Sequence, residues 1–159
     1  MGNEGLIERD LTRRVIGAFH EVYNELGAGF LEQVYETSLA LALRESGCRV
    51  LQQVGLDVFF RAHKVGECRA DLLVDSRLVV EIKAVNHLSP IHEVQLVNYL
   101  KATKIPVGLL LNFGPRPTFR RRALNFQPAK SAFIRVNPRQ ETQCLKKYSL
   151  PTAAKLPVG

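Results

Sequence analysis

The chain of 159 residues has the length of a single domain, and its 46% hydrophobic and 23% charged residues exclude a wholly disordered protein. No apolar run approaches the roughly 20 residues that span a bilayer, and the first residues lack the apolar segment of a signal peptide, so we expect a cytoplasmic protein without membrane contacts. The net charge of +7 is unevenly spread, because residues 1–113 carry 12 basic and 14 acidic side chains, whereas residues 114–159 carry 10 basic and one acidic.

Two amphipathic helices are predicted in the first third of the chain. Apolar residues recur at three- and four-residue spacing over residues 8–26, and the glycine-containing segment 27–29 breaks this pattern. A second helical pattern follows over residues 30–46 and stops at Gly47. Its apolar side contains Leu31, Tyr35, Leu39, Ala42 and Leu43.

The hydrophobic period then changes to one typical of strands. Residues 50–60 are rich in β-branched and aromatic side chains, and a turn is expected at residues 62–66. Two further strands are predicted over residues 67–74 and 78–85, with a tight polar connection between them.

A third helix and a fourth strand complete the predicted core. Ser89 followed by Pro90 is a favourable start for a helix over residues 91–102. Its apolar positions at helical spacing are Val94, Val97 and Leu100. The continuous apolar run at residues 107–113 predicts a strand buried on both faces.

This order of elements predicts one α/β domain over residues 1–126, in which helices cover a sheet. From residue 127 to residue 159 we expect a basic, weakly patterned C-terminal extension, although residues 132–136 fit a short strand. The three cysteines include no Cys-x-x-Cys pair, so neither a disulfide framework nor a zinc site is indicated.

The residues with the clearest chemical potential lie in the segment 69–85. A hairpin that turns at Ser76 places Asp71 directly opposite Glu81, with the Cβ atoms ~5 Å apart. Two carboxylates at that distance repel unless a proton or a cation lies between them, and Mg²⁺ favours such ligands. Lys83 lies on the same strand face as Glu81, because alternate residues of a strand share a face.

A Glu-x-Lys pair on a half-exposed strand is, however, more often a solvated ion pair. The strongly apolar neighbours of Glu81 favour a central strand, and charges in a central strand need a partner because their unpaired burial is costly. A shift of the turn by one residue would break the facing arrangement of Asp71 and Glu81, and the sequence leaves the register open.

Two helices contribute further candidates. On the second helix, Glu32 falls within the apolar stripe and is expected to face the sheet, whereas Glu36 is expected to be solvated. On the third helix, His92, Gln95 and Tyr99 share one polar face, which is a weak signal when taken alone. The chain contains no glycine-rich phosphate loop, no His-Glu-x-x-His and no Gly-x-Ser-x-Gly, so nucleotide hydrolysis, zinc proteolysis and serine-hydrolase chemistry lose support.

The order of Glu32, Asp71, Glu81-x-Lys83 and Gln95-x-x-x-Tyr99 resembles the PD-(D/E)xK nuclease superfamily, in particular its RecB-like and lambda-exonuclease-like branch. The chain is also similar to the GxxExxY protein family, whose motif matches Gly29-Phe-Leu-Glu32-Gln-Val-Tyr35. Further similar segments are Arg69–Asp75, Val80–Ala84, Pro90–His92 with Gln95, and Leu111–Phe113. Ala70-Asp71 stands in place of the Pro-Asp of the motif.

The resemblance implies a three-layer, restriction-endonuclease-like α/β core with a mixed central sheet flanked by helices. It implies that Asp71, Glu81 and the Ile82 carbonyl bind Mg²⁺ or Mn²⁺, and that Glu32 holds a water of that cation or a second ion. It further implies that Lys83 positions or activates the attacking water, and that Gln95 and Tyr99 orient the scissile phosphate.

These observations lead to a metal-dependent nuclease with a nucleic-acid substrate, most simply DNA, as the first hypothesis. A catalytically silent module of the same fold that binds nucleic acid or a protein partner is the alternative, and a structural domain with a core ion pair is a third. The basic residues that follow the last predicted core strand are expected to contact phosphates: Arg116, Arg120, Arg121 and Arg122. A homo-oligomer stays open.

Overall fold

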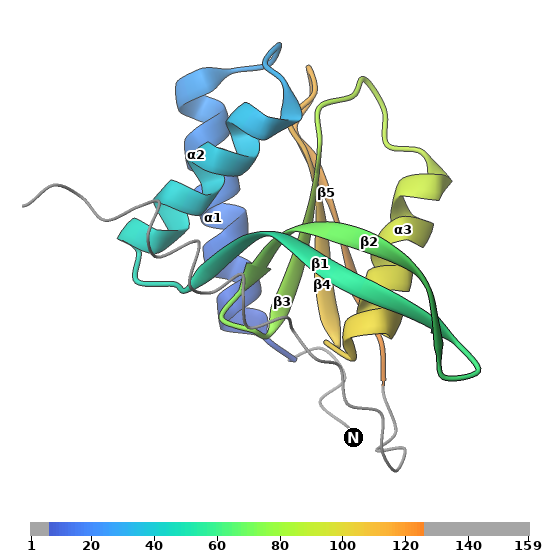
Figure 1. Ribbon diagram of the computed structural model, residues 1–159. Helices are drawn as coiled ribbons and strands as arrows, with labels where there is room; N and C mark the ends of the chain where they lie inside the picture. Colours follow the sequence, from blue (N-terminus) through green and yellow to red (C-terminus); the bar gives the residue numbers. More distant parts are fainter. Residues whose placement is uncertain (1–6, 126–159) are drawn as a thin grey trace, which may run out of the picture.

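The computed structural model describes residues 7–125, which form a five-stranded mixed sheet with helices on both faces (Figure 1). In chain order the elements are α1 (Arg9–Leu26), α2 (Glu32–Glu45), β1 (Val50–Phe60), β2 (His63–Val74), β3 (Leu78–Lys83), α3 (Pro90–Thr103), β4 (Val107–Asn112) and β5 (Thr118–Ala123). The predicted α/β class and its mixed central sheet are confirmed. Within these residues no helix has the length and apolar character needed to cross a membrane.

The strands lie side by side in the order of the chain, so β3 is the central strand. Its pairing with β4 is parallel, because α3 provides the crossover, and every other pairing is antiparallel. β2 and β3 pair Leu72 with Val80 and Val74 with Leu78, which is the register expected for a turn at Ser76. The predicted central position of β3 is therefore confirmed, and the register that the sequence leaves open is the one that a turn at Ser76 produces.

Two hydrophobic clusters fill the layers on either side of the sheet. On β3, Val80 and Ile82 pack in the cluster formed with α1 and α2, whereas Val79 packs in the cluster formed with α3. This alternation sends the side chains of Glu81 and Lys83 to the α3 side of the sheet. The central position of β3 therefore places two charged side chains among buried neighbours.

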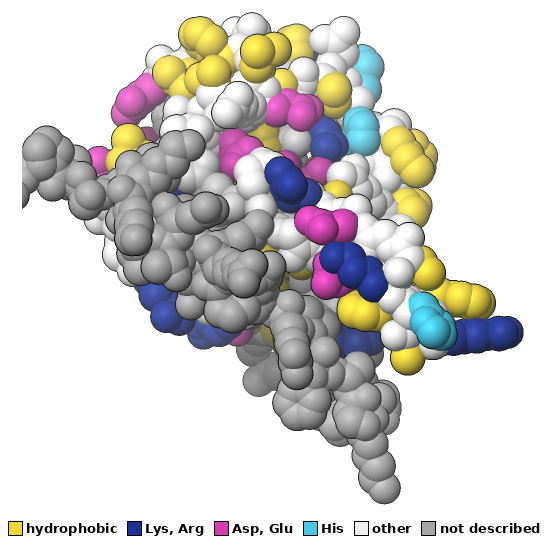
Figure 2. All heavy atoms as spheres, viewed as in Figure 1, with side chains coloured by type: hydrophobic (Ala, Val, Ile, Leu, Met, Phe, Trp, Pro, Cys, Tyr) yellow, Lys and Arg dark blue, Asp and Glu magenta, His cyan; other side chains and the backbone are white. Residues whose placement is uncertain are grey.

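The hairpin between β1 and β2 is longer than predicted. The turn consists of Arg61 and Ala62, both left-handed with φ of 48° and 65°, so the expected turn at residues 62–66 is wrong beyond Ala62. Two left-handed turn residues match the right-handed twist of paired strands. The tip of the hairpin projects from the body, and Figure 2 shows hydrophobic and positively charged side chains there.

Two further predictions need correction. Val94 was expected to face the core but is 50% exposed, because the buried face of α3 consists of Leu96, Tyr99 and Leu100. The segment after β4 was expected to be weakly patterned, yet it contains the edge strand β5. An edge strand is held by backbone hydrogen bonds to one neighbour and needs no apolar alternation. The expected extension from residue 127 onward, including the segment 132–136, lies outside the described residues.

Candidate active site

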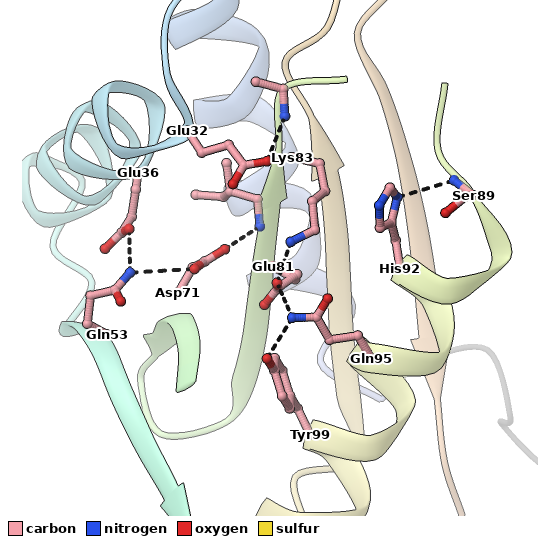
Figure 3. Close-up of polar contacts among 12 residues, drawn as sticks. Glu32, Glu36, Gln53, Asp71, Glu81, Lys83, Ser89, His92, Gln95 and Tyr99 are labelled. Atoms are coloured by element: carbon pink, nitrogen blue, oxygen red, sulfur yellow. Dashed lines mark hydrogen bonds and ion pairs between the residues drawn. The ribbon is translucent and has the colours of Figure 1, made fainter. Parts of the chain in front are cut away.

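The polar residues predicted from β2, β3 and α3 come together at the carboxyl end of the central strand (Figure 3). The last pair of β2 and β3 in the direction of β3 is Leu72 with Val80. Asp71 on β2 and Glu81 on β3 are the next residues beyond this pair. The parallel strand β4 continues beside β3 to Asn112, which pairs with Lys83. In the space-filling view, acidic and basic side chains gather on this face between α2 and α3 (Figure 2).

Glu81 is the most deeply buried charged side chain of the site, with only 2% of its surface exposed. Its Oε1 accepts hydrogen bonds from Lys83 Nζ at 2.7 Å and from Gln95 Nε2 at 2.8 Å. Its Oε2 is buried without a hydrogen-bond partner. Burial and the nearby negative charge of Asp71 raise the pKa of Glu81 to about 7, against the opposing effect of Lys83. A cation beside this carboxylate would favour its charged form and lower this pKa.

The carboxylate of Asp71, on β2, contacts the backbone of β3. Its Oδ2 accepts a hydrogen bond from the Ile82 N–H at 2.7 Å. Burial raises the pKa of Asp71, whereas the Ile82 N–H and the charge of Lys83 lower it. The backbone of β3 thus fixes one oxygen of the Asp71 carboxylate beside the neighbouring Glu81.

Lys83 is largely buried and charged. Burial alone would lower the pKa of Lys83, but its hydrogen bond to Glu81 and the negative charges of Glu81, Glu32 and Asp71 outweigh that effect and raise it. Lys83 therefore carries a proton under ordinary conditions. A protonated ammonium group can donate hydrogen bonds to water or phosphate but cannot act as a general base.

Glu32 reaches the site by a route that differs from the expected one. It is exposed at the first residue of α2, so the prediction that it lies within the buried stripe is wrong. Its Oε1 nevertheless accepts a hydrogen bond from the Ala84 N–H at 3.3 Å, directly after β3. Glu36, expected to be solvated, is instead 6% exposed, and burial raises its pKa. The helix begins at Glu32, and its buried face contains Tyr35, Glu36 and Leu39.

Gln95 and Tyr99 lie together on the inner face of α3, as their spacing predicts. Gln95 Nε2 donates to the Tyr99 hydroxyl at 2.6 Å as well as to Glu81. Burial raises the pKa of Tyr99. His92 does not join them, because its Nδ1 accepts a hydrogen bond from the Ser89 N–H at 3.2 Å and helps to cap the helix.

Asn112 lies in the region of the site, although the sequence predicts no role for it. It is 1% exposed, and its side chain makes two hydrogen bonds of 2.9 Å with the N–H and carbonyl of Val85. These bonds fix the segment that follows Lys83. Gly114 packs closely here, since a Cβ atom at that position would lie 1.9 Å from the Val85 carbonyl oxygen. The signal available was an asparagine at the end of an otherwise apolar strand.

The four arginines expected to contact phosphates are separated by the sheet. Arg120 and Arg122 face α3, where both pair with Glu93. Arg121 alternates to the other face and donates to the Ile7 carbonyl at 2.7 Å. Arg116 is exposed in the connection between β4 and β5. Two of the four therefore lie on the face of the sheet that carries Glu81.

Comparison with known protein families identifies the superfamily of the chain. The family model of the PD-(D/E)XK nuclease superfamily matches residues 9–122, which include all the helices and nearly all of the strands described above. The chain belongs to the PD-(D/E)XK nuclease superfamily. The crystal structure of SSO0001 is similar at 19% sequence identity and a TM-score of 0.47, and the match covers 76% of this chain and 60% of that one. No curated protein sequence matches the chain significantly.

The superfamily typically uses a divalent metal ion and acts on nucleic acids, and the chemistry of the site agrees with such an ion. Among residues 7–125 no group of three or more His, Cys, Asp and Glu side chains converges as a complete ligand set. Mg²⁺, however, commonly uses one or two carboxylates and completes its shell with water and phosphate. Asp71 and Glu81 provide two, and the buried Oε2 of Glu81 lacks a partner that a cation would supply.

Proposed function

We propose that the protein is a metal-dependent nuclease that hydrolyses phosphodiester bonds in DNA. The observation that carries this proposal is the environment of Glu81: one oxygen accepts from Lys83 and Gln95, and the other is buried without a partner. A core ion pair alone does not account for this asymmetry, because burial of an unsatisfied carboxylate oxygen is costly.

In this proposal Asp71, Glu81 and the Ile82 carbonyl hold Mg²⁺ or Mn²⁺. A bound divalent cation would neutralise the charge that develops on the phosphate during in-line attack by water. Glu32, the first residue of α2, reaches the backbone just after β3 and would hold a water of the cation or a second ion. The attack joins the water oxygen to phosphorus and breaks one ester P–O bond, which leaves a phosphate monoester and a free hydroxyl.

Lys83 acts in this proposal as a charged donor. One of its three N–H groups bonds Glu81, which leaves the others for the attacking water or for a phosphate oxygen. Gln95 and Tyr99, which already share a hydrogen bond, orient the scissile phosphate. Arg120 and Arg122, which lie on the face of the sheet that carries Glu81, hold the flanking phosphates once Glu93 releases them, and the exposed Arg116 assists them. Arg121 takes no part in this contact, because its side chain lies on the opposite face.

We further propose that the chain is a member of the GxxExxY family, and the structure offers a physical reason for each motif residue. Gly29 has φ of 111°, a value that favours glycine. Glu32 reaches the end of β3. The Tyr35 hydroxyl donates to the Gly27 carbonyl at 2.7 Å and accepts from the Phe30 N–H at 3.1 Å, so it closes the loop before Glu32.

The experiment that tests this function compares cleavage and binding on the same substrates. Purified protein is incubated with linear DNA, circular DNA and RNA in Mg²⁺, Mn²⁺ or EDTA. We expect cleavage of DNA with either metal and none in EDTA, with DNA binding retained in Asp71→Ala, Glu81→Ala and Lys83→Ala but cleavage lost. Asp57→Ala is the matched control, since Asp57 is an exposed acidic residue of β1. A wild-type protein that binds DNA but cleaves nothing in any metal would favour the silent binding module.

A further inference from the structure

A chain of hydrogen bonds connects the buried face of α2 to Asp71 through the strand β1 (Figure 3). Glu36 Oε2 accepts from Gln53 Nε2 at 2.6 Å. The same nitrogen lies 3.5 Å from Asp71 Oδ1. The other oxygen of Asp71 is held by the Ile82 N–H, so both oxygens of this carboxylate have a donor. Neither Glu36 nor Gln53 has a role in the function proposed above.

The backbone of Gln53 indicates that this contact is maintained at a cost. Gln53 has φ of 54°, a left-handed conformation that residues other than glycine rarely adopt within a strand. The pairing of β1 with β2 passes from Gln52–Leu72 to Val54–Ala70, so Gln53 and Asp71 are left out of the ladder. Strained backbone of this kind persists where the surrounding structure holds it, commonly at functional sites.

Gln52 shows what an ordinary structural contact in this region looks like. Gln52 Nε2 donates to the other oxygen of Glu36 at 3.3 Å, and its Oε1 accepts from Arg44 at 3.2 Å. Gln52 has no positive φ and pairs regularly with Leu72. It therefore shares Glu36 with Gln53 without sharing the contact to Asp71, which makes it a matched control.

We propose that Glu36 and Gln53 are positioning residues for the cation site. Glu36 orients the Gln53 amide, and the amide together with the Ile82 N–H fixes the plane of the Asp71 carboxylate. Residues that orient a metal ligand from outside the coordination shell commonly change metal affinity 10- to 100-fold when they are replaced. This inference rests on the proposed function in one respect, which is that Asp71 binds a divalent cation.

Calorimetric titration with Mn²⁺ and thermal unfolding in EDTA test the inference without any cleavage assay. For Gln53→Gly we expect a Kd for Mn²⁺ at least about tenfold higher than that of the wild type. We also expect an equal or higher Tm without metal, because glycine relieves the left-handed backbone. Gln53→Asn, which also tolerates this conformation, is the second variant, and Glu36→Gln should weaken Mn²⁺ binding as well. Gln52→Ala should bind Mn²⁺ within about twofold of the wild type.

Three outcomes overturn the inference, and they differ from one another. Wild-type Mn²⁺ affinity in both Gln53 variants shows that Asp71 needs no positioning and leaves the proposed function intact. If both Gln53 variants have a lower Tm in EDTA as well as a weaker affinity for Mn²⁺, the contacts of Glu36 and Gln53 serve only the stability of the fold. A wild-type protein that binds no Mn²⁺ removes the inference together with the proposed metal site.

Discussion

Lys83 Nζ and Glu81 Oε1 lie 2.7 Å apart on the α3 side of the central strand, and the second oxygen of Glu81 is buried without a hydrogen bond. The pair therefore satisfies only half of the carboxylate. Because an unsatisfied buried oxygen costs free energy, this relationship lowers the free energy of unfolding of the metal-free protein. The pH dependence of stability reports on it directly.

The metal-free protein should lose stability as the pH rises from about 4.5 to about 7. Glu81 has a folded-state pKa of about 7, above the ordinary 4.5, so the folded state binds a proton that the unfolded state has released. The free energy of unfolding falls by an amount on the order of 3 kcal/mol over that range. Burial also raises the pKa of Asp71, which acts in the same direction. Urea denaturation in EDTA across this range measures the slope.

Two variants decide whether Glu81 causes this slope. Glu81→Gln should flatten it and prevent stabilisation by Mg²⁺, because glutamine resembles the protonated acid. Glu67→Gln, at an exposed carboxylate of β2, should retain the wild-type slope. An unchanged slope in Glu81→Gln would assign the pH dependence to other groups.

Asn112→Leu should destabilise the protein strongly. The Asn112 amide satisfies the N–H and carbonyl of Val85, and its oxygen also accepts from the Gly114 N–H at 3.2 Å. Leucine would leave these buried and partly buried groups unpaired, at a cost of roughly 3 kcal/mol in the free energy of unfolding. Asn98→Leu, at an exposed position of α3, is the control for urea denaturation. Equal stability of the two variants would contradict the role of Asn112.

Tyr35→Phe should lower the free energy of unfolding by about 1–2 kcal/mol, because it removes both hydrogen bonds of the hydroxyl. The stacking of the ring on Phe113, with a centroid distance of 4.4 Å, is retained. Tyr23→Phe loses one exposed hydrogen bond to the Pro115 carbonyl and should cost less. Thermal unfolding of the two variants compares them, and a larger loss in Tyr23→Phe would show that the loop before Glu32 does not depend on Tyr35.

Replacement of the four arginines by glutamine should weaken DNA binding equally for all sequences and reduce its salt dependence. The four are Arg116, Arg120, Arg121 and Arg122. Glu93→Gln should have the opposite effect, because it frees the two guanidinium groups that Glu93 pairs. Fluorescence anisotropy at several salt concentrations measures both changes. A salt slope that stays the same in the fourfold variant would exclude these residues from the DNA contact.

The sequence predicts the central grouping of the site except for the register of the hairpin between β2 and β3, which it leaves open. Strand alternation puts Glu81 and Lys83 on one face, and a turn at Ser76 brings Asp71 to Glu81, so two local rules decide the arrangement. The spacing of Gln95 and Tyr99 on a helix is equally local. These residues meet because β3 is central and α3 follows it directly.

The features that the sequence did not reveal depend on the tertiary structure. The burial of Glu36 depends on the residue at which α2 begins and on two glutamines of β1 that donate to its carboxylate. The spacing of residues along the helix predicts neither. β5 was not predicted because its three consecutive arginines show no alternation of apolar and polar residues. The strand is held by backbone pairing with β4. The left-handed conformation of Gln53 could not be predicted either, because glutamine rarely adopts a positive φ.

Single-turnover cleavage of end-labelled DNA with saturating Mg²⁺ shows whether the residues around Glu81 form a catalytic site. It compares the wild type with Lys83→Ala at equal occupancy of DNA and metal, both determined by titration. We expect cleavage by the wild type, none in EDTA, and a rate at least about 100-fold lower in Lys83→Ala with unchanged DNA binding. Equal rates in the two proteins, or no cleavage by a wild type that binds both DNA and Mg²⁺, would contradict this expectation.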